Sequence, residues 1–159
     1  MGEYPLSVAT SALISDGKVL LLKRQKNPYR GFWALPSGKV QKHEEMAQAA
    51  IRQVIDDTKI TSQFKGYHGF VSKHLLENGK ISHHFLLHLF SLEPLTKEVT
   101  KTQQEFIKWF DLKHLGKMKR IIVPSDFMMI EKMIKKQEKN YYNCVLEKKG
   151  KKHMLRKFE

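Results

Sequence analysis

Two adjacent carboxylates, Asp56 and Asp57, stand at the end of the clearest helical pattern in the 159-residue chain. Apolar residues recur at steps of three and four between Glu44 and Thr58, which predicts a helix with one buried face. Acidic side chains are disfavoured at the negative end of a helix dipole, so this pair indicates a functional role. Carboxylates act as acid–base groups or as oxygen ligands of hard cations, and this helix end offers both kinds of chemistry.

The segment around this pair, from Gly38 to Ile60, reads GKVQKHEEMAQAAIRQVIDDTKI. It resembles the signature box of the Nudix hydrolase superfamily, G-x5-E-x7-R-E-U-x-E-E-x-G-U, where U is a bulky aliphatic residue. The residues that match the box are Gly38, Glu44, Arg52, Val54 and Ile60. The preceding GFWALPSG also resembles the family's G-x-W-x-L-P-G-G lead-in, with Ser37 in place of one glycine.

The resemblance implies an α/β fold, namely a Nudix-like α/β/α sandwich with a mixed β-sheet, formed by residues 1–159 as a single domain. It implies metal-dependent hydrolysis of a pyrophosphate bond in a nucleoside diphosphate linked to another moiety, such as ADP-ribose, or in a nucleoside triphosphate. The implied cofactor is Mg²⁺ or Mn²⁺, which neutralises developing charge and activates a water. The implied metal ligands are Asp56 and Asp57, with the backbone carbonyl of Gly38 as a further ligand.

The chain departs from the box on the helix face that carries this chemistry. Residues 53, 56 and 57 share one face, because side chains three and four positions apart are neighbours on a helix. Gln53 replaces a family glutamate and cannot accept a proton, while Asp56 and Asp57 are each one methylene shorter than glutamate. These departures keep an alternative open, a catalytically impaired Nudix-fold module that binds nucleotides or RNA. A structural or assembly subunit is a third class.

Three further acidic residues are candidates for the reaction. Glu44 belongs to the box, and we assign it, with Gln53 and Glu105, to the catalytic positions. Glu105 stands four residues before Trp109, where family members often supply an additional acid, and Glu98 is the second choice. For both of these acids, a solvated surface carboxylate is the alternative. Arg52 is assigned a structural role, because it can pair with Glu44 or with Asp56 at i+4.

Several other side chains have candidate roles outside the helix. Arg24 and Arg30 precede the box and are candidates for phosphate contacts, with surface solvation as the alternative. Lys59 stands where the family has a glycine in a left-handed turn, and a stabilising role at the negative helix end is favoured there. The three histidines at positions 83, 84 and 88 do not converge on a strand, which argues against a metal site. Cys144 is expected to pack in the core.

The elements that position these residues follow from hydrophobic patterning. Strands are expected at 6–14, 19–24, 63–70, 81–92 and 105–110, with hairpin turns at Asp16-Gly17 and around Asn78-Gly79. Trp33–Pro36 is expected to be extended and Ser37-Gly38 to turn. A second helix is expected after Ser125 as its N-cap, with a buried stripe of Phe127, Ile130, Met133 and Ile134. Residues 141–147 and 153–158 are expected to form a terminal hairpin.

Composition limits the partners. The chain has 29 Lys and Arg against 16 Asp and Glu, a net charge of +13, with +4 in residues 1–112 and +9 in residues 113–159. Such a field favours polyanions, and a small-molecule nucleotide meets that requirement without nucleic acid. We expect no membrane association and a cytoplasmic location, since no long apolar run or secretory signal is visible and Cys144 is the only cysteine. The oligomeric state is left open, a homodimer being one option.

Overall fold

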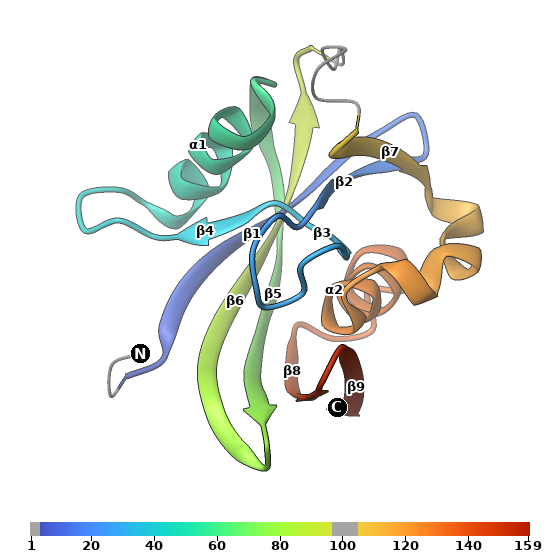
Figure 1. The fold of residues 1–159 in the computed structure, drawn as a ribbon. Helices are drawn as coiled ribbons and strands as arrows, with labels where there is room; N and C mark the ends of the chain where they lie inside the picture. Colours follow the sequence, from blue (N-terminus) through green and yellow to red (C-terminus); the bar gives the residue numbers. More distant parts are fainter. Residues whose placement is uncertain (1–3, 97–104) are drawn as a thin grey trace.

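A mixed β-sheet forms the centre of the computed structural model, which describes residues 4–96 and 105–159 (Figure 1). The strand order is β3-β2-β1-β6-β5-β8-β9, with β4 paired to β1 and β7 paired to β2. The β1–β6 and β5–β8 pairs are parallel, whereas the remaining strand pairs are antiparallel. The strands are β1 (Leu6–Ser15), β2 (Lys18–Lys23), β3 (Trp33–Ala34), β4 (Ser37–Lys39), β5 (Ser62–Glu77), β6 (Lys80–Pro94), β7 (Ile107–Asp111), β8 (Tyr141–Lys149) and β9 (Lys152–Phe158).

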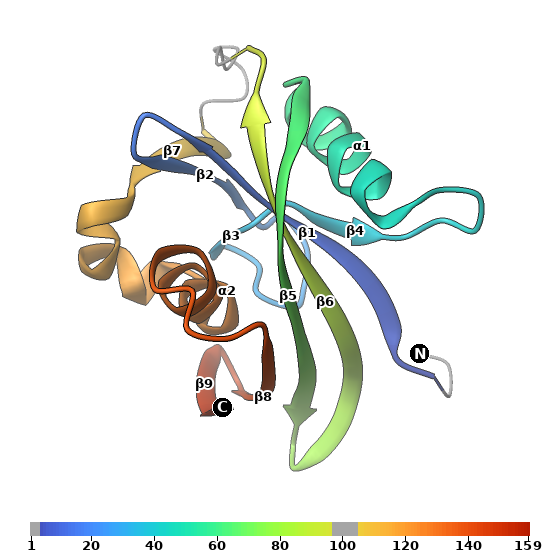
Figure 2. The same ribbon diagram turned by 180° about the vertical axis from the view of Figure 1, so that it is seen from behind.

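Helices cover the two faces of this sheet. Helix α1 (Met46–Thr58) lies on one face, and α2 (Pro124–Met129) lies on the other, continued by the π-helical segment η2 (Ile130–Lys135) (Figures 1 and 2). A 3₁₀ segment, η1 (Leu112–Ile121), connects β7 to α2. The expected α/β sandwich with a mixed sheet is therefore confirmed.

Strand β1 shows how the two layers of core arise. Its residues alternate between the faces, because successive side chains of a strand point in opposite directions. Val8 and Ala12 pack in the core layer under α2, whereas Ala9 and Leu13 pack under α1. Strand β1 is thus buried on both faces, which agrees with its continuous run of buried positions.

Most expected elements are confirmed at or near their expected bounds. The strands at 6–14 and 19–24, the helix over 44–58 and the hairpin over 141–158 appear as β1, β2, α1 and β8–β9. Lys59 ends α1 in the left-handed conformation, with φ 64°, as its position in the box predicts. The stripe of the second helix is buried at Phe127, Ile130, Met133 and Ile134.

Two expectations about local structure were wrong, and one expected strand is longer than predicted. Ser37-Gly38 is not a turn but part of β4, which pairs with Val8–Thr10 of β1. Ser125 is not an N-cap, because the second helix begins two residues earlier, with Val123 as N-cap and Pro124 in the first turn. The strand expected at 63–70 continues to Glu77 as part of β5, with β-bulges near its start.

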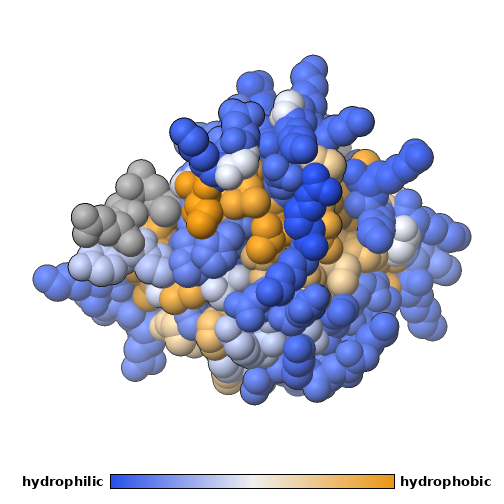
Figure 3. All heavy atoms as spheres, turned by 90° about the horizontal axis from the view of Figure 1, so that it is seen from below, coloured by the Kyte–Doolittle hydropathy of each residue, from blue (hydrophilic) through white to orange (hydrophobic). Residues whose placement is uncertain are grey.

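The lysine doublets of the last third lie on a folded element. Lys148, Lys149, Lys151 and Lys152 surround the β8–β9 turn, so these residues form a hairpin tip, as the sequence predicts. Hydrophilic side chains cover much of the face shown in Figure 3, and hydrophobic side chains gather near its centre. In the described parts of the chain, none of the helices is both long enough and apolar enough to cross a membrane.

Candidate functional site

The last turns of α1 carry the predicted chemical face. Ala49, Ala50 and Val54 are buried against the sheet, which turns the opposite side of the helix outward. On that side the Gln53 amide Nε2 donates to Asp57 Oδ1 at 3.0 Å. Burial raises the pKa of Asp57, and the hydrogen bond from Gln53 acts against this shift. Gln53 therefore orients the Asp57 carboxylate through a hydrogen bond, whereas a glutamate at this position would add a third negative charge.

Asp56 and Asp57 have different contacts, although the charge of Asp56 contributes to the raised pKa of Asp57. Asp56 is exposed, and its Oδ2 accepts from Arg52 Nη1 at 3.2 Å. Asp57 is half-buried and lines a cavity of about 430 Å³, here called the helix cavity. Basic side chains from the end of β2 and the following loop line the same cavity: Lys23, Arg24 and Lys26. The structure thus assigns the two carboxylates to different surroundings, with Asp57 facing cationic groups.

Close packing explains the glycine at position 38. A Cβ atom there would overlap the side chain of Gln53, so any other residue would displace Gln53 from its contact with Asp57. Gly38 and Ser37 are brought beside α1 by the β4–β1 pairing. The residues assigned to metal binding therefore lie in one region, although Asp56 is held by Arg52.

Arg52 connects the loop before α1 to the helix. Its Nη2 donates to Glu44 Oε1 at 2.7 Å and to the Lys39 carbonyl at 3.2 Å, and its Nε donates to Glu44 Oε2 at 2.9 Å. Glu44 Oε1 also accepts from the Gln41 amide. The hydrogen bonds from Arg52 and then from the Gln41 amide lower the pKa of Glu44 to about 2. Arg52 thus forms both ion pairs considered for it, and the contacts of Glu44 favour a positioning role over a catalytic one.

The remaining residues that the sequence predicts for the site, Arg30 and Glu105, do not line the helix cavity. Arg30 is exposed and lines neither the helix cavity nor the second cavity described below. Glu105 is exposed in the turn before β7, and its neighbour Phe106 lines the helix cavity in its place. Glu98 lies outside the described residues. In the described part of the chain, no group of three or more His, Cys, Asp or Glu side chains could hold a metal ion.

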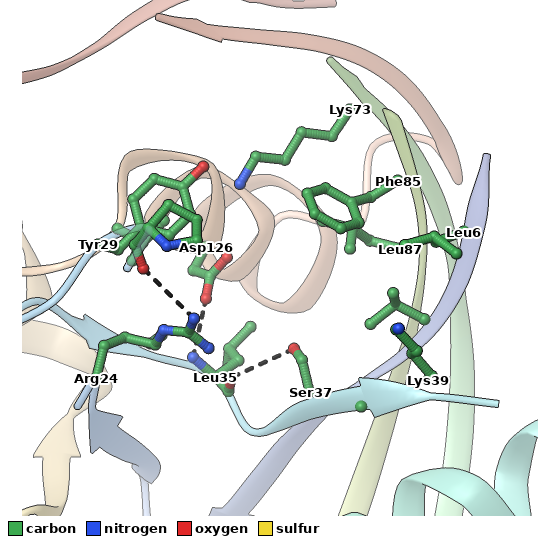
Figure 4. Close-up of a pocket in the computed structure, with 15 residues that line it drawn as sticks. Leu6, Arg24, Tyr29, Leu35, Ser37, Lys39, Lys73, Phe85, Leu87 and Asp126 are labelled. Carbon is green, nitrogen blue, oxygen red and sulfur yellow. Dashed lines mark hydrogen bonds between the residues drawn. The ribbon is translucent and has the colours of Figure 1, made fainter. Parts of the chain in front are cut away.

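A second cavity, here called the sheet cavity, lies between the sheet and α2 and encloses about 210 Å³ (Figure 4). Lys73 from β5, Asp126 from α2 and Tyr29 from the β2–β3 loop all contribute to its lining. Arg24 and Ser37 line both cavities, so the two adjoin each other. The sheet cavity therefore extends from Gly38 to the buried polar side chains of Lys73, Asp126 and Tyr29.

Lys73 is the most unusual residue of the sheet cavity. Only 3% of it is exposed, its Nζ donates to Ser125 Oγ at 2.8 Å, and Nζ lies 4.5 Å from the centre of the Tyr29 ring. Burial alone lowers the pKa of this lysine, but interactions with Tyr29 and Asp126 outweigh it and the net shift is upward. Lys73 is therefore a buried ammonium ion stabilised by its neighbours.

Asp126 is the buried carboxylate of the same cavity. Its Oδ2 accepts from the Leu35 amide at 2.9 Å, which ties α2 to the segment before β4. Burial raises the pKa of Asp126, whereas Lys73, the Leu35 amide and Arg24 act in the opposite direction. The sequence analysis missed both Lys73 and Asp126. A lysine between Val71 and Leu75, both fully buried on the same strand face, was the available signal.

The histidines and the cysteine have structural surroundings. His84 hydrogen-bonds Ser72 and stacks on His74, whereas His88 hydrogen-bonds Tyr67. Cys144 is buried in the core, and burial raises the pKa of its thiol to about 11. Cys144 thus packs in the core, as the sequence predicts.

Comparisons with known proteins place these features in a family. The sequence profile of the NUDIX domain matches residues 5–132. The chain is 27% identical over 138 residues to the Nudix hydrolase YvcI of Bacillus subtilis, covering 84% of this chain and 82% of YvcI. It is 32% identical over 69 residues to the ADP-ribose pyrophosphatase of Methanocaldococcus jannaschii, covering 43% of this chain and 41% of that relative. The crystal structure of a NUDIX hydrolase from Nitrosomonas europaea superposes with a TM-score of 0.70 at 18% identity, covering 93% of this chain and 82% of that one.

Proposed function

The chain belongs to the NUDIX domain family, and on this basis we propose that it hydrolyses a pyrophosphate bond in a nucleoside diphosphate linked to another moiety. Names of relatives such as the Nudix hydrolase YvcI and the ADP-ribose pyrophosphatase support hydrolysis of this kind. The free, buried Cys144 also supports a reducing location such as the cytoplasm.

The observation that carries the proposal is the composition of the helix cavity. Asp57 lines it together with Lys23, Arg24 and Lys26, and Arg24 interacts electrostatically with the Asp57 carboxylate. These cations suit the charges of a phosphate chain. Because the sheet cavity adjoins it through Arg24 and Ser37, a bound nucleotide has room for its phosphates beside α1 and for an attached group under α2. The two cavities thus suit the two parts of such a substrate.

The residues present fit a divalent cation that is shared with the substrate. Mg²⁺ usually keeps several waters and binds one or two carboxylates together with substrate phosphates, so a complete protein cage is unnecessary. Asp57 would be the principal ligand, with Asp56 and the carbonyl of Gly38 as the further candidates. A bound Mg²⁺ or Mn²⁺ would neutralise phosphate charge and make a bound water more acidic.

The chain's own residues then have distinct tasks. Arg24 and the lysines of the helix cavity attract and orient the phosphates. Gln53 holds the Asp57 carboxylate, and the Arg52–Glu44 pair fixes the loop that leads from β4 into α1. The proposed catalytic roles of Glu44 and Glu105 lack support from their contacts, and we retain Glu105 only as a candidate near Phe106.

Hydrolysis of a substrate panel tests this function. We would incubate the full chain and its Asp57→Asn variant with ADP-ribose, a dinucleoside polyphosphate, an oxidised deoxynucleoside triphosphate and capped RNA, with Mg²⁺ or Mn²⁺ or with excess EDTA. We expect phosphate-containing products from at least one substrate, lost in EDTA and in the variant. Turnover that persists in EDTA or in Asp57→Asn would contradict the assigned site.

One observation favours a binding module as the second candidate. Gln53 replaces one family carboxylate, and Asp56 is bonded to Arg52, so among the described residues Asp57 is the one carboxylate that lines the helix cavity. On this alternative the fold binds a nucleotide or RNA without cleaving it. No turnover on any of the substrates, together with tight RNA binding that weakens steeply with salt, would favour this alternative.

A further inference from the structure

The buried end of the sheet cavity carries opposite charges that do not neutralise each other by direct contact. No ion pair within 4.0 Å joins Lys73 to Asp126 among the described residues. Instead the Ser125 hydroxyl lies between them, accepting from Lys73 at 2.8 Å and lying 3.5 Å from Asp126 Oδ1. Lys73 is 3% exposed and Asp126 is 7% exposed, so water cannot replace the missing partners freely.

Both Lys73 and Asp126 have donors or acceptors that form no hydrogen bond of good geometry among the described residues. An ammonium group has three N–H donors: one is used in the hydrogen bond to Ser125, and a second is directed at the Tyr29 hydroxyl oxygen, so one donor remains. The Asp126 carboxylate uses Oδ2 for the Leu35 amide, while Oδ1 has only the long contact with Ser125. The Tyr29 hydroxyl is buried and, among the described residues, has no hydrogen-bond partner of good geometry. Lys73, Tyr29 and Asp126 lie together at the cavity in Figure 4.

This pattern has a chemical complement. A carbonyl oxygen accepts two hydrogen bonds, which matches the donors of Lys73 and Tyr29, and an adjacent N–H matches the free oxygen of Asp126. The cavity of about 210 Å³ corresponds to the liquid volume of roughly seven water molecules, which suits one planar ring system. Aliphatic side chains and the Phe85 ring cover the remaining walls and suit the faces of such a ring.

We propose that the sheet cavity is a base-recognition site selective for an oxo-base, whose ring carbonyl binds Lys73 and Tyr29 and whose neighbouring N–H binds Asp126. The proposal rests on the function proposed above and names the nucleotide class of the same substrate. An amino-base such as adenine offers Asp126 an amino donor, but its ring nitrogen accepts only one hydrogen bond. One buried donor is then left unpaired, which costs affinity.

Inosine and adenosine diphosphates form a matched pair of probes, because they differ only at this edge of the base. We would measure binding of IDP and ADP to the full chain by calorimetry in EDTA, with inorganic pyrophosphate as the probe of phosphate binding alone. We expect IDP to bind at least about tenfold more tightly than ADP and than pyrophosphate. Equal affinities, a preference for ADP, or no measurable binding of either nucleotide would overturn the proposal.

Asp126→Asn tests recognition with a side chain of the same shape. The asparagine Oδ1 can still accept from the Leu35 amide, whereas its Nδ2 presents a donor where the carboxylate presented an acceptor. We expect the preference for IDP to disappear or reverse, while Lys157→Met, an exposed control on β9, keeps it. An unchanged preference in Asp126→Asn would contradict the assignment. Because this assay needs no turnover, an inactive chain that still prefers IDP would contradict only the proposed hydrolysis.

Discussion

The end of α1 and the buried end of the sheet cavity handle charge in opposite ways. At the end of α1, Gln53, Asp56 and Asp57 lie within five positions of one another, and Asp56 faces solvent. In the sheet cavity, Lys73 is bonded to a residue 52 positions away, and Asp126 to one 91 positions away. The first region is built by one helix, and the second exists only when the sheet, the β2–β3 loop and α2 have assembled.

This difference separates the source of reactivity from the source of selectivity. The charge of Asp56 is exposed and screened, and Asp57 is only half-buried, so the acids at the end of α1 can change at smaller cost to the fold than fully buried charges. Buried charges depend on each other, so a change in the sheet cavity alters stability together with recognition. We therefore expect substitutions at the end of α1 to act on rate and substitutions in the sheet cavity to act first on folding.

Of the substitutions considered, Lys73→Met should have the largest effect on stability, because it removes the buried positive charge of the sheet cavity. Methionine keeps the unbranched apolar stem of the side chain, without the terminal ammonium, and leaves the Asp126 carboxylate without its buried counter-charge. We expect the free energy of unfolding to fall by about 3 kcal/mol, measured by urea denaturation. The exposed Lys157→Met should change it by less than about 0.5 kcal/mol. A loss below about 1 kcal/mol in Lys73→Met would show that the buried charges are not coupled.

Asp57→Asn and Asp56→Asn compare two neighbouring carboxylates at the end of α1. Only Asp57 lines the helix cavity, so Asp57→Asn should lower kcat/KM by about a hundredfold or more, whereas Asp56→Asn should lower it less than tenfold. Both variants should unfold within about 1 kcal/mol of the parent chain. Equal losses of rate would mean that the two carboxylates act as one unit despite their separate contacts.

The sequence predicts the end of α1 well because its information is local. The step of three and four residues defines the helix, the box spacing places residues 53, 56 and 57 on one face, and Lys59 takes the left-handed conformation expected there. The pairing of Arg52 with Glu44 also follows from the box. The different hydrogen bonds of the two aspartates, Asp56 with Arg52 and Asp57 with Gln53, could not be predicted from spacing alone. They depend on which of several nearby side chains forms the better contact.

The sheet cavity escapes prediction because its contacts are non-local. Ser125 was interpreted as a helix N-cap, whereas it lies inside the helix and bonds Lys73. The proline before it marked the true start, since proline favours the first helical position. The sequence predicts a turn at Ser37-Gly38, and only the register with β1 shows these residues to be part of β4. Pairings of this kind are fixed by the whole sheet.

Gln53→Glu sharpens the comparison by restoring the third carboxylate of the family box. The new side chain can no longer donate to Asp57 and adds a like charge beside it, so the metal-free protein should lose about 1 kcal/mol of stability. With Mg²⁺ present we expect about tenfold tighter apparent metal affinity and an equal or higher kcat. Gln63→Glu is the matched control, because it likewise loses a hydrogen bond to a carboxylate, that of Glu93, and adds a like charge beside it on exposed strands. It should leave the metal affinity and kcat unchanged.

Glu44→Gln should have the smallest effect, and its dependence on pH identifies the charge that matters. Arg52 lowers the pKa of Glu44 to about 2, below the ordinary value of 4.5. A group whose pKa is lowered on folding stabilises the fold above its unfolded pKa and loses this contribution as pH falls through the folded pKa. The Tm difference between the parent chain and Glu44→Gln should therefore be constant near neutrality and shrink between pH 4.5 and about 2. If it stays constant over that window, the glutamate acts through hydrogen bonding that the neutral amide reproduces, and the charge of the Arg52 pair is not what holds the loop before α1.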